Sequence, residues 1–263
     1  MAKSTSQSKY FDLELSHGGR VATLTLHEDK FNLLNTPALD ELLELGTEIR
    51  TLPKLRLVIL TGAGERAFIG GADIREMAEF TPHSALRFID KVHQACHLFR
   101  ALPVPSIARV RGYCLGAGME IAACCDLRIA SDDSHFGMPE VQLGLPSVVE
   151  AAMLPTLIGW GRTRELLYTG RIIDAVTAYE IGFIEAIATP EALDETLQPW
   201  IDQILAADPA AIRAQKRLIE GWLDSGVAAG VQAGMDAFTR IFDSGNALER
   251  TRDFLARKAA PKG

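Results

Sequence analysis

A short apolar run at residues 57–60, Leu-Val-Ile-Leu, is the feature that most constrains how this chain folds. The run stops at Thr61-Gly62-Ala63-Gly64, so it has the length of a strand rather than that of a helix. A strand that is apolar at every position is buried on both faces, as in a parallel sheet covered by helices on each side. The sequence therefore predicts an α/β fold, and 263 residues are enough to bury the core of such a fold.

Strand and helix patterns alternate along the first half of the chain. Residues 11–26 alternate apolar and polar side chains around a His17-Gly18-Gly19 turn, which predicts an antiparallel hairpin. Thr36 before Pro37 and Thr81 before Pro82 each predict a helix N-terminus, because Thr caps the first turn and Pro suits its first position. Further strands are expected at residues 106–110 and 127–130.

The second half of the chain has a different pattern, which is helical almost to the end after Pro146. No low-complexity linker divides the sequence, so we expect one α/β core with a helical extension. The predicted regions are a disordered tail over residues 1–9, the core over residues 10–200 and a helical region over residues 201–263. Amphipathic stretches at 228–242 and 247–258 are suited to packing on this chain or on a neighbouring copy.

Charge and cysteine content narrow the functional classes. A formal net charge of -7 provides no general basic surface, which argues against bulk binding of nucleic acid but leaves room for a few cations around an anionic ligand. The four cysteines form no C-x-x-C pair, so reduced buried thiols are expected instead of a zinc site. The polar N-terminus lacks the apolar run of a secretory signal, which favours a cytoplasmic protein, with a mature organellar protein as the alternative.

Two glycine-rich turns, each leading into a helix, are the strongest indication of chemistry. The first turn is Gly70-Gly71-Ala72-Asp73, and the second is Gly112-Tyr113-Cys114-Leu115-Gly116-Ala117-Gly118. Each turn presents main-chain N–H groups at the start of a helix, where the helix dipole is positive. Small side chains also allow a ligand to approach the backbone closely. Two such amides can share one oxyanion, although glycine turns of this kind also serve packing alone.

Two glutamates follow these turns. Glu120 comes three residues after Ala117, so its carboxylate can lie near the amide end of that helix. Glu140 lies among apolar and turn residues in Ser134-His135-Phe136-Gly137-Met138-Pro139-Glu140-Val141, where burial would raise its pKa toward that of a useful acid or base. Either residue alone has a simple structural explanation, but two carboxylates beside an oxyanion site suggest a mechanism.

Together, these segments resemble the crotonase family, the enoyl-CoA hydratases and isomerases. The resemblance extends from about residue 11 to residue 258 and is carried by AFIGGADI (67–74), GYCLGAGME (112–120), CDLRIA (125–130) and FGMPE (136–140). It implies an α/β spiral of ββα units with a helical C-terminal region that forms trimers, often paired into hexamers. It also identifies Ala72 and Ala117 as the two residues whose amides form the oxyanion hole. At the position of Ala117, relatives commonly have glycine.

The family pattern of two glutamates implies an enoyl-CoA hydratase, a lyase of fatty-acid metabolism such as β-oxidation. In the implied reaction Glu120 takes a proton from the water that attacks C3, and Glu140 delivers a proton to C2. The sequence does not fix which glutamate has which role. An isomerase or dehydratase acting on a specialised acyl-CoA, and a non-catalytic acyl-CoA-binding or RNA-binding member of the fold, remain alternatives.

Coenzyme A is implied as part of the substrate, with no separate cofactor, no nucleic acid and no membrane partner. The resemblance places substrate contacts at Lys30, Phe31, Gly70, Asp73, Ile74, Arg75 and Lys258. Lys30 and Arg75 are the phosphate candidates, and Lys258 could act in the site of a neighbouring copy or be a solvated surface charge. No metal is expected, because His93 and His97 have metal-ligand spacing but no third ligand.

The chain departs from the family after Glu140. Relatives often have a glycine-rich stretch there, whereas this chain reads Ser147-Val148-Val149-Glu150. The two valines predict a more crowded or more apolar pocket wall. Ser147 is a candidate cap of the next helix, and Glu150 is interpreted as a first-turn residue without a catalytic role.

Overall fold

The computed structural model describes residues 4–243 and 246–259. The chain forms two compact units, Met1–Leu205 and Ala206–Gly263. The boundary falls after residue 205 rather than after residue 200, because α7 (Leu193–Ala206) packs Leu197 and Ile201 into the core of the first unit.

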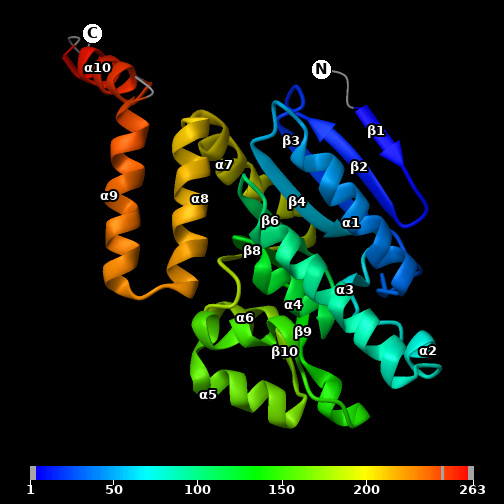
Figure 1. The fold of residues 1–263 in the computed structure, drawn as a ribbon. Helices are drawn as coiled ribbons and strands as arrows, with labels where there is room; N and C mark the ends of the chain where they lie inside the picture. Colours follow the sequence, from blue (N-terminus) through cyan, green and yellow to red (C-terminus); the bar gives the residue numbers. More distant parts are fainter. Residues whose placement is uncertain (1–3, 244–245, 260–263) are drawn as a thin grey trace. The chain divides into compact units, whose positions relative to one another are not determined.

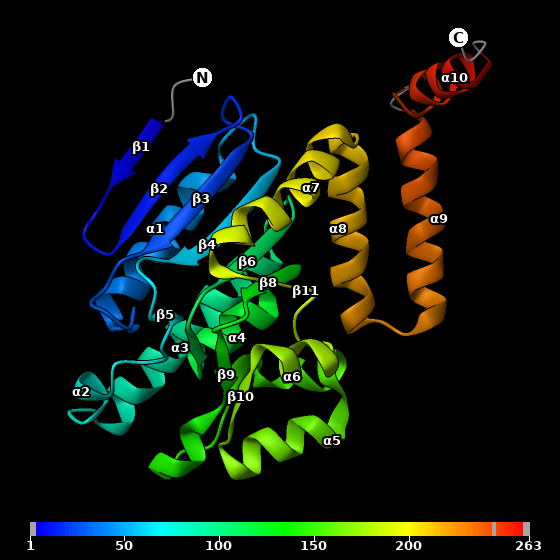
Figure 2. The same ribbon diagram turned by 180° about the vertical axis from the view of Figure 1, so that it is seen from behind.

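A seven-stranded sheet forms the centre of the first unit, in the order β1-β2-β3-β4-β6-β8-β11 (Figures 1 and 2). The first three strands pair antiparallel, and β3, β4, β6, β8 and β11 pair parallel. The hairpin predicted at residues 11–26 and the strands predicted around 57, 106 and 127 are confirmed. The strands are β1 (Ser4–Gln7), β2 (Phe11–Ser16), β3 (Val21–Leu26), β4 (Leu57–Gly62), β6 (Ser106–Val110), β8 (Leu127–Ser131) and β11 (Ala186–Ala188).

Strand β4 is buried on both faces, as its apolar run predicts. Val58 and Leu60 join the core formed with α1 (Thr36–Arg50) and α3 (Pro82–Arg100). Leu57 and Ile59 point to the other face, where they pack in a second core with α7. Helices therefore cover both faces of the sheet, as in an α/β fold.

A smaller sheet of four strands runs in the order β10-β9-β7-β5. Strand β5 (Ala67–Ile69) follows β4, β7 (Tyr113–Leu115) follows β6, and β9 (His135–Gly137) follows β8, so each turn of the chain adds one strand to each sheet. The strand pairs lead into α2 (Ile74–Met77) and α3, into α4 (Ala117–Cys124), and into later helices. This is the expected spiral of ββα units.

Several local predictions need correction. Residues 4–7 are not part of a disordered tail but form β1, because their backbone pairs with the exposed edge of β2. Asn35, rather than Thr36, caps α1 through its side chain, which accepts from the Ala38 N–H. Residues 113–115, expected within a glycine turn, form a strand because β5 and β9 flank them.

The pattern after Pro146 is mostly helical, but two three-residue strands interrupt it. β10 (Ile172–Asp174) and β11 each complete the edge of a sheet. The remaining elements of the first unit are η1 (Pro139–Leu143), η2 (Val149–Met153), α5 (Leu154–Thr169), α6 (Ala175–Glu180) and η3 (Pro190–Ala192).

The second unit consists of α8 (Pro209–Asp224), α9 (Val227–Asp243) and α10 (Asn246–Ala259). The predicted amphipathic stretches correspond to α9 and α10, and α9 exposes Val231, Met235 and Phe238. Across 4–243 and 246–259, no helix has the length and apolar character required to span a bilayer. The formation of trimers remains an expectation.

Candidate active site

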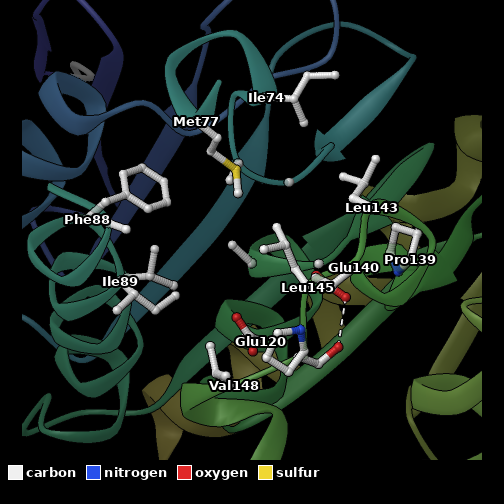
Figure 3. A pocket seen from close by; sticks show the side chains of 18 of the residues that line it. Ile74, Met77, Phe88, Ile89, Glu120, Pro139, Glu140, Leu143, Leu145 and Val148 are labelled. Atoms are coloured by element: carbon white, nitrogen blue, oxygen red, sulfur yellow. Dashed lines mark hydrogen bonds between the residues drawn. The ribbon is translucent and has the colours of Figure 1, made fainter. Parts of the chain in front are cut away.

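A cavity of about 360 Å³ opens between α2 and α3 on one side and η1 with its following loop on the other. Figure 3 shows Ile74, Met77, Phe88 and Ile89 on the first wall and Leu143, Leu145 and Val148 on the second. Glu140 lies on the second wall beside Pro139, and Glu120 lines the cavity from α4. These two glutamates are the only ionisable residues that line the cavity among the described parts of the chain. A largely apolar pocket with a few polar groups is typical of a site for a small molecule.

The loop before α2 holds Ala72 in a fixed, extended arrangement. The Leu34 N–H donates to the Gly71 carbonyl and the Asp73 N–H donates to the Leu34 carbonyl, each over 2.8 Å. Because these two bonds flank Ala72, its own N–H lies on the opposite side of the extended chain. Ala72 lines the cavity, so this amide is a donor candidate there.

The start of α4 supplies the second amide. Ala117 is the first residue of the helix, and the first turn closes when the Glu120 N–H donates to the Gly116 carbonyl over 3.0 Å. The amides of the residues between have no acceptor within the helix, and they carry the positive end of its dipole. The structure therefore brings Ala72 and Ala117 to the same cavity, as the motif predicts.

The glycines of the two turns make close contacts within the protein itself. A Cβ at Gly118 would lie 2.3 Å from the Ile69 carbonyl oxygen, and a Cβ at Gly70 would lie 2.8 Å from that of Phe31. At Gly116, with φ of +52°, a Cβ would lie 2.4 Å from Glu140 Oε1. Packing of α4 and of Glu140 therefore accounts for these glycines, in addition to any need for ligand approach.

Glu120 is buried in the first turn of α4, with 4% of its surface exposed. Its Oε1 accepts from the Ala151 N–H over 3.2 Å, and that N–H also donates to the Val148 carbonyl. Burial, followed by the negative charges of Glu140 and Glu150, raises the pKa of Glu120 to about 8. Glu120 thus holds a proton at neutral pH.

Glu140 reaches the cavity from η1 and is only half-buried. Its Oε2 accepts from the Ser147 hydroxyl over 2.8 Å, the bond drawn in Figure 3. Ser147 was expected to cap a helix, but the cap position of η2 belongs to Val148, whose side chain makes no cap bond. The Ser147 hydroxyl is oriented toward Glu140 instead.

The predicted substrate-binding residues are distributed around this cavity. Gly70 and Ile74 line it, whereas Lys30 is exposed with its Nζ 5.2 Å from the centre of the Phe31 ring. The Phe31 carbonyl accepts from the Gly70 N–H, which fixes the loop beside the cavity.

The two charged residues at the start of α2 pair with each other. Asp73 caps α2 and accepts from Arg75 Nε over 2.9 Å, and this partner lowers the pKa of the Asp73 carboxyl. Arg75 also lies 3.6 Å from Asp29, with 68% of its side chain exposed. Any phosphate at Arg75 therefore competes with two carboxylates. Lys258 is a residue of α10 in the second unit, and its side chain lies outside the described residues.

Other contacts around the site are not evident from the sequence. The Ala151 amide and the apolar side chains of α3 carry no motif, and their positions depend on helix packing. Glu150 is buried and pairs with His93, whose ring lies 6.2 Å from that of His97. Within residues 4–243 and 246–259, no cluster of three or more His, Cys, Asp or Glu side chains has the arrangement of a metal site.

Known proteins resemble this chain over nearly its whole length. The sequence profile of the enoyl-CoA hydratase/isomerase family matches residues 16–261. A crotonyl-CoA hydratase of Syntrophomonas wolfei is 32% identical over 253 residues, which cover 95% of this chain and 97% of that protein. A short-chain-enoyl-CoA hydratase of Clostridium acetobutylicum is 32% identical over 93% of this chain and 94% of its own. The crystal structure of an enoyl-CoA hydratase from Bacillus anthracis superposes with a TM-score of 0.87 at 30% identity, over 97% of this chain and 96% of that chain.

Proposed function

The chain belongs to the enoyl-CoA hydratase/isomerase family, and we propose that it is an enoyl-CoA hydratase that reversibly adds water to a trans-2-enoyl-CoA. The observation that carries the proposal is the meeting of two carboxylates and two outward-facing amides in one apolar cavity. An isomerase needs to move a single proton, whereas addition of water uses both an acid and a base.

The thioester carbonyl is proposed to accept hydrogen bonds from the Ala72 and Ala117 amides. Attack of water at C3 moves negative charge onto this oxygen, and the start of α4 stabilises that charge. The apolar side chains of α3 and of the loop after η1 hold the acyl group and exclude bulk water, which strengthens these hydrogen bonds.

The proton balance requires one proton on the pair formed by Glu120 and Glu140. The water oxygen bonds to C3 and loses a proton to the ionised carboxylate, while the protonated carboxyl gives its proton to C2. The pair then again holds one proton, on the other glutamate. The raised pKa of Glu120 supports such a singly protonated pair, because two adjacent carboxylates resist double ionisation.

The coenzyme A portion is proposed to extend from the cavity past Gly70 and Ile74 toward Lys30 and Arg75. Both cations are exposed, Lys30 on the loop before Phe31 and Arg75 in α2. Lys258 is proposed to reach the site of a neighbouring copy in a trimer. The reaction needs no metal and no cofactor other than the coenzyme A of the substrate.

Loss of enoyl-thioester absorbance on a series of trans-2-enoyl-CoA chain lengths tests the proposal. We expect hydration of at least one member, with the 3-hydroxyacyl-CoA identified by mass spectrometry. A product of unchanged mass with a shifted double bond would instead identify an isomerase. If no member is converted while acyl-CoA still binds, a non-catalytic role is indicated.

A further inference from the structure

A third carboxylate lies behind the cavity and is not used by the proposed reaction. Glu150 belongs to η2, has 7% of its side chain exposed, and does not line the cavity. Its Oε1 lies 2.7 Å from His93 Nδ1 on α3, and the His93 side chain is 52% exposed. A carboxylate buried to this degree is costly unless it is paired, and His93 supplies one partner.

The other oxygen of Glu150 is unusual. Its Oε2 is buried and has no hydrogen-bond partner within the part of the chain that the structure describes. The preceding residue, Val149, has φ of +39°, a strained backbone conformation for a β-branched side chain. Strain of this kind persists where the surrounding structure imposes it, often near functional sites.

Glu150 and Glu120 are linked through the same short segment. The Ala151 N–H, next to Glu150 in the chain, donates to Glu120 Oε1. The charge of Glu150 also contributes to the raised pKa of Glu120. The segment therefore presents both a hydrogen-bond donor and a negative charge to Glu120.

The other titratable groups around this carboxylate that the described residues supply lie on α3, α4 and η1. Cys96 on α3 interacts electrostatically with both Glu150 and Glu120. Burial raises the pKa of the Cys96 thiol well above the usual range, so the thiol remains neutral. Cys124 on α4 interacts with Cys96, and His97 lies one turn from His93. On η1, Glu140 acts on Glu120 from the cavity side.

The charged residues of α5, which also packs on η2, have other partners: Arg164 lies over the Trp160 ring, 5.2 Å from its centre. Glu165 pairs with Arg162 and Arg171. His93 is therefore the basic group that pairs with Glu150 among the described residues.

We propose that Glu150, paired with His93, is a positioning residue whose charge holds the shared proton on Glu120. Its mechanistic meaning rests on the proposed hydratase function. A negative charge behind Glu120 disfavours a second negative charge there, so the proton stays on the pair at neutral pH. The contact with His93 is the ion pair that the described residues give this carboxylate, so loss of His93 should weaken the effect of Glu150 on Glu120.

Infrared titration of the full-length protein tests this proposal without relying on any reaction. The band of the protonated Glu120 carboxyl is identified as the band lost in E120Q, and its disappearance is followed as the pH rises. In the wild type we expect a midpoint near 8. In E150Q the midpoint should fall by about half a pH unit or more, because the neighbouring charge is gone.

Matched variants separate a charge effect from a structural one. E150D retains the charge and should keep the midpoint near that of the wild type. H93A, at an exposed helix position, should lower the midpoint as E150Q does, and the double variant should lower it no further. H97A, one turn away on the same helix face, should leave it unchanged.

Unchanged midpoints in folded E150Q and H93A would overturn the proposal, and so would equal shifts in H97A. If E150Q does not fold, H93A alone decides the question. A shifted midpoint in a protein that hydrates no enoyl-CoA would reject the hydratase function while supporting the charge effect. In an active enzyme, the high-pH limb of kcat/KM should move with the infrared midpoint, with KM changed less than twofold.

Discussion

Glu120 is carried by a helix in which every residue is buried, whereas Glu140 is carried by a 3-10 turn in which none is. The first carboxylate is held by a main-chain N–H and surrounded by packed α4 and η2. The second is held by the hydroxyl of Ser147, across a loop with exposed apolar side chains.

This difference separates two tasks within one pocket. The α4 wall, which carries Ala117 and Glu120, sets the proton affinity of its carboxylate chiefly through burial. The η1 wall depends on side-chain contacts, so its carboxylate and its acyl-facing residues can change with little effect on the core. We infer that the charge state of the site is set on α4 and that substrate preference is set on the η1 side.

Neutralising each carboxylate should have the largest effects and tests whether both walls are needed. E120Q and E140Q should each lower kcat for enoyl-CoA hydration by about 10²- to 10⁴-fold, the range for loss of a general acid or base. KM should change little, because the contacts proposed for the acyl group are with apolar side chains. Steady-state kinetics on purified variants with unchanged circular dichroism would measure this, and a variant with near wild-type kcat would remove that glutamate from the mechanism.

The second prediction removes the amide on the α4 wall without removing a side chain that contacts the acyl group. Proline is tolerated in the first turn of a helix, so A117P should fold, with the N–H donor replaced by the Cδ of the proline ring. We expect kcat to fall by about 10²- to 10³-fold. A117G, which retains the N–H, is the matched control and should remain active. Equal kcat in A117P and A117G would contradict an oxyanion role for this amide.

The third prediction concerns the contact that orients Glu140. S147A removes its hydroxyl donor, and a single hydrogen bond is worth about 1 kcal/mol, so kcat/KM should fall roughly five- to tenfold. S147T keeps the hydroxyl and should recover most of the activity. If S147A hydrates substrate at the wild-type rate, the η1 wall does not depend on this contact.

The fourth prediction uses stability to test the α4 wall without substrate. Because the folded-state pKa of Glu120 is raised from 4.5 to about 8, its ionisation opposes folding increasingly as the pH rises through this range. E120Q should therefore raise the free energy of unfolding at pH 8 by on the order of a few kcal/mol relative to the wild type. The melting temperature at pH 8 should rise accordingly. This gain should shrink toward pH 5.

E44Q, on the exposed face of α1, serves as the control for a surface glutamate. Melting curves of both variants at the two pH values measure the effect. The same gain for E120Q at pH 5 and pH 8 would show that ionisation of Glu120 does not oppose folding.

The sequence predicts the elements that depend on local patterning. The apolar run of β4 correctly predicts a strand that is buried on both faces, and the Thr81-Pro82 pair correctly predicts the start of α3. The motif order places Ala72, Ala117, Glu120 and Glu140, and the cavity brings them together.

Contacts between distant segments could not be predicted. The sequence of β7 is that of a glycine turn, and the segment forms a strand because it pairs with β5 and β9. The contact between His93 and Glu150 joins residues that are 57 positions apart. Ser147 has the sequence features of a helix cap, but its hydroxyl donates to Glu140. These interactions depend on how helices and loops pack, which a single sequence does not encode as a local pattern.

The central claim is that Glu120 and Glu140 act as one singly protonated pair on one enoyl thioester. The most direct measurement compares kcat for hydration in E120Q, E140Q and the double variant under identical conditions. Because the proton cannot pass between water and C2 when either carboxylate is missing, kcat of the double variant should be little lower than that of the poorer single variant. A loss in the double variant equal to the product of the two single losses would show that the glutamates act independently and would contradict the claim.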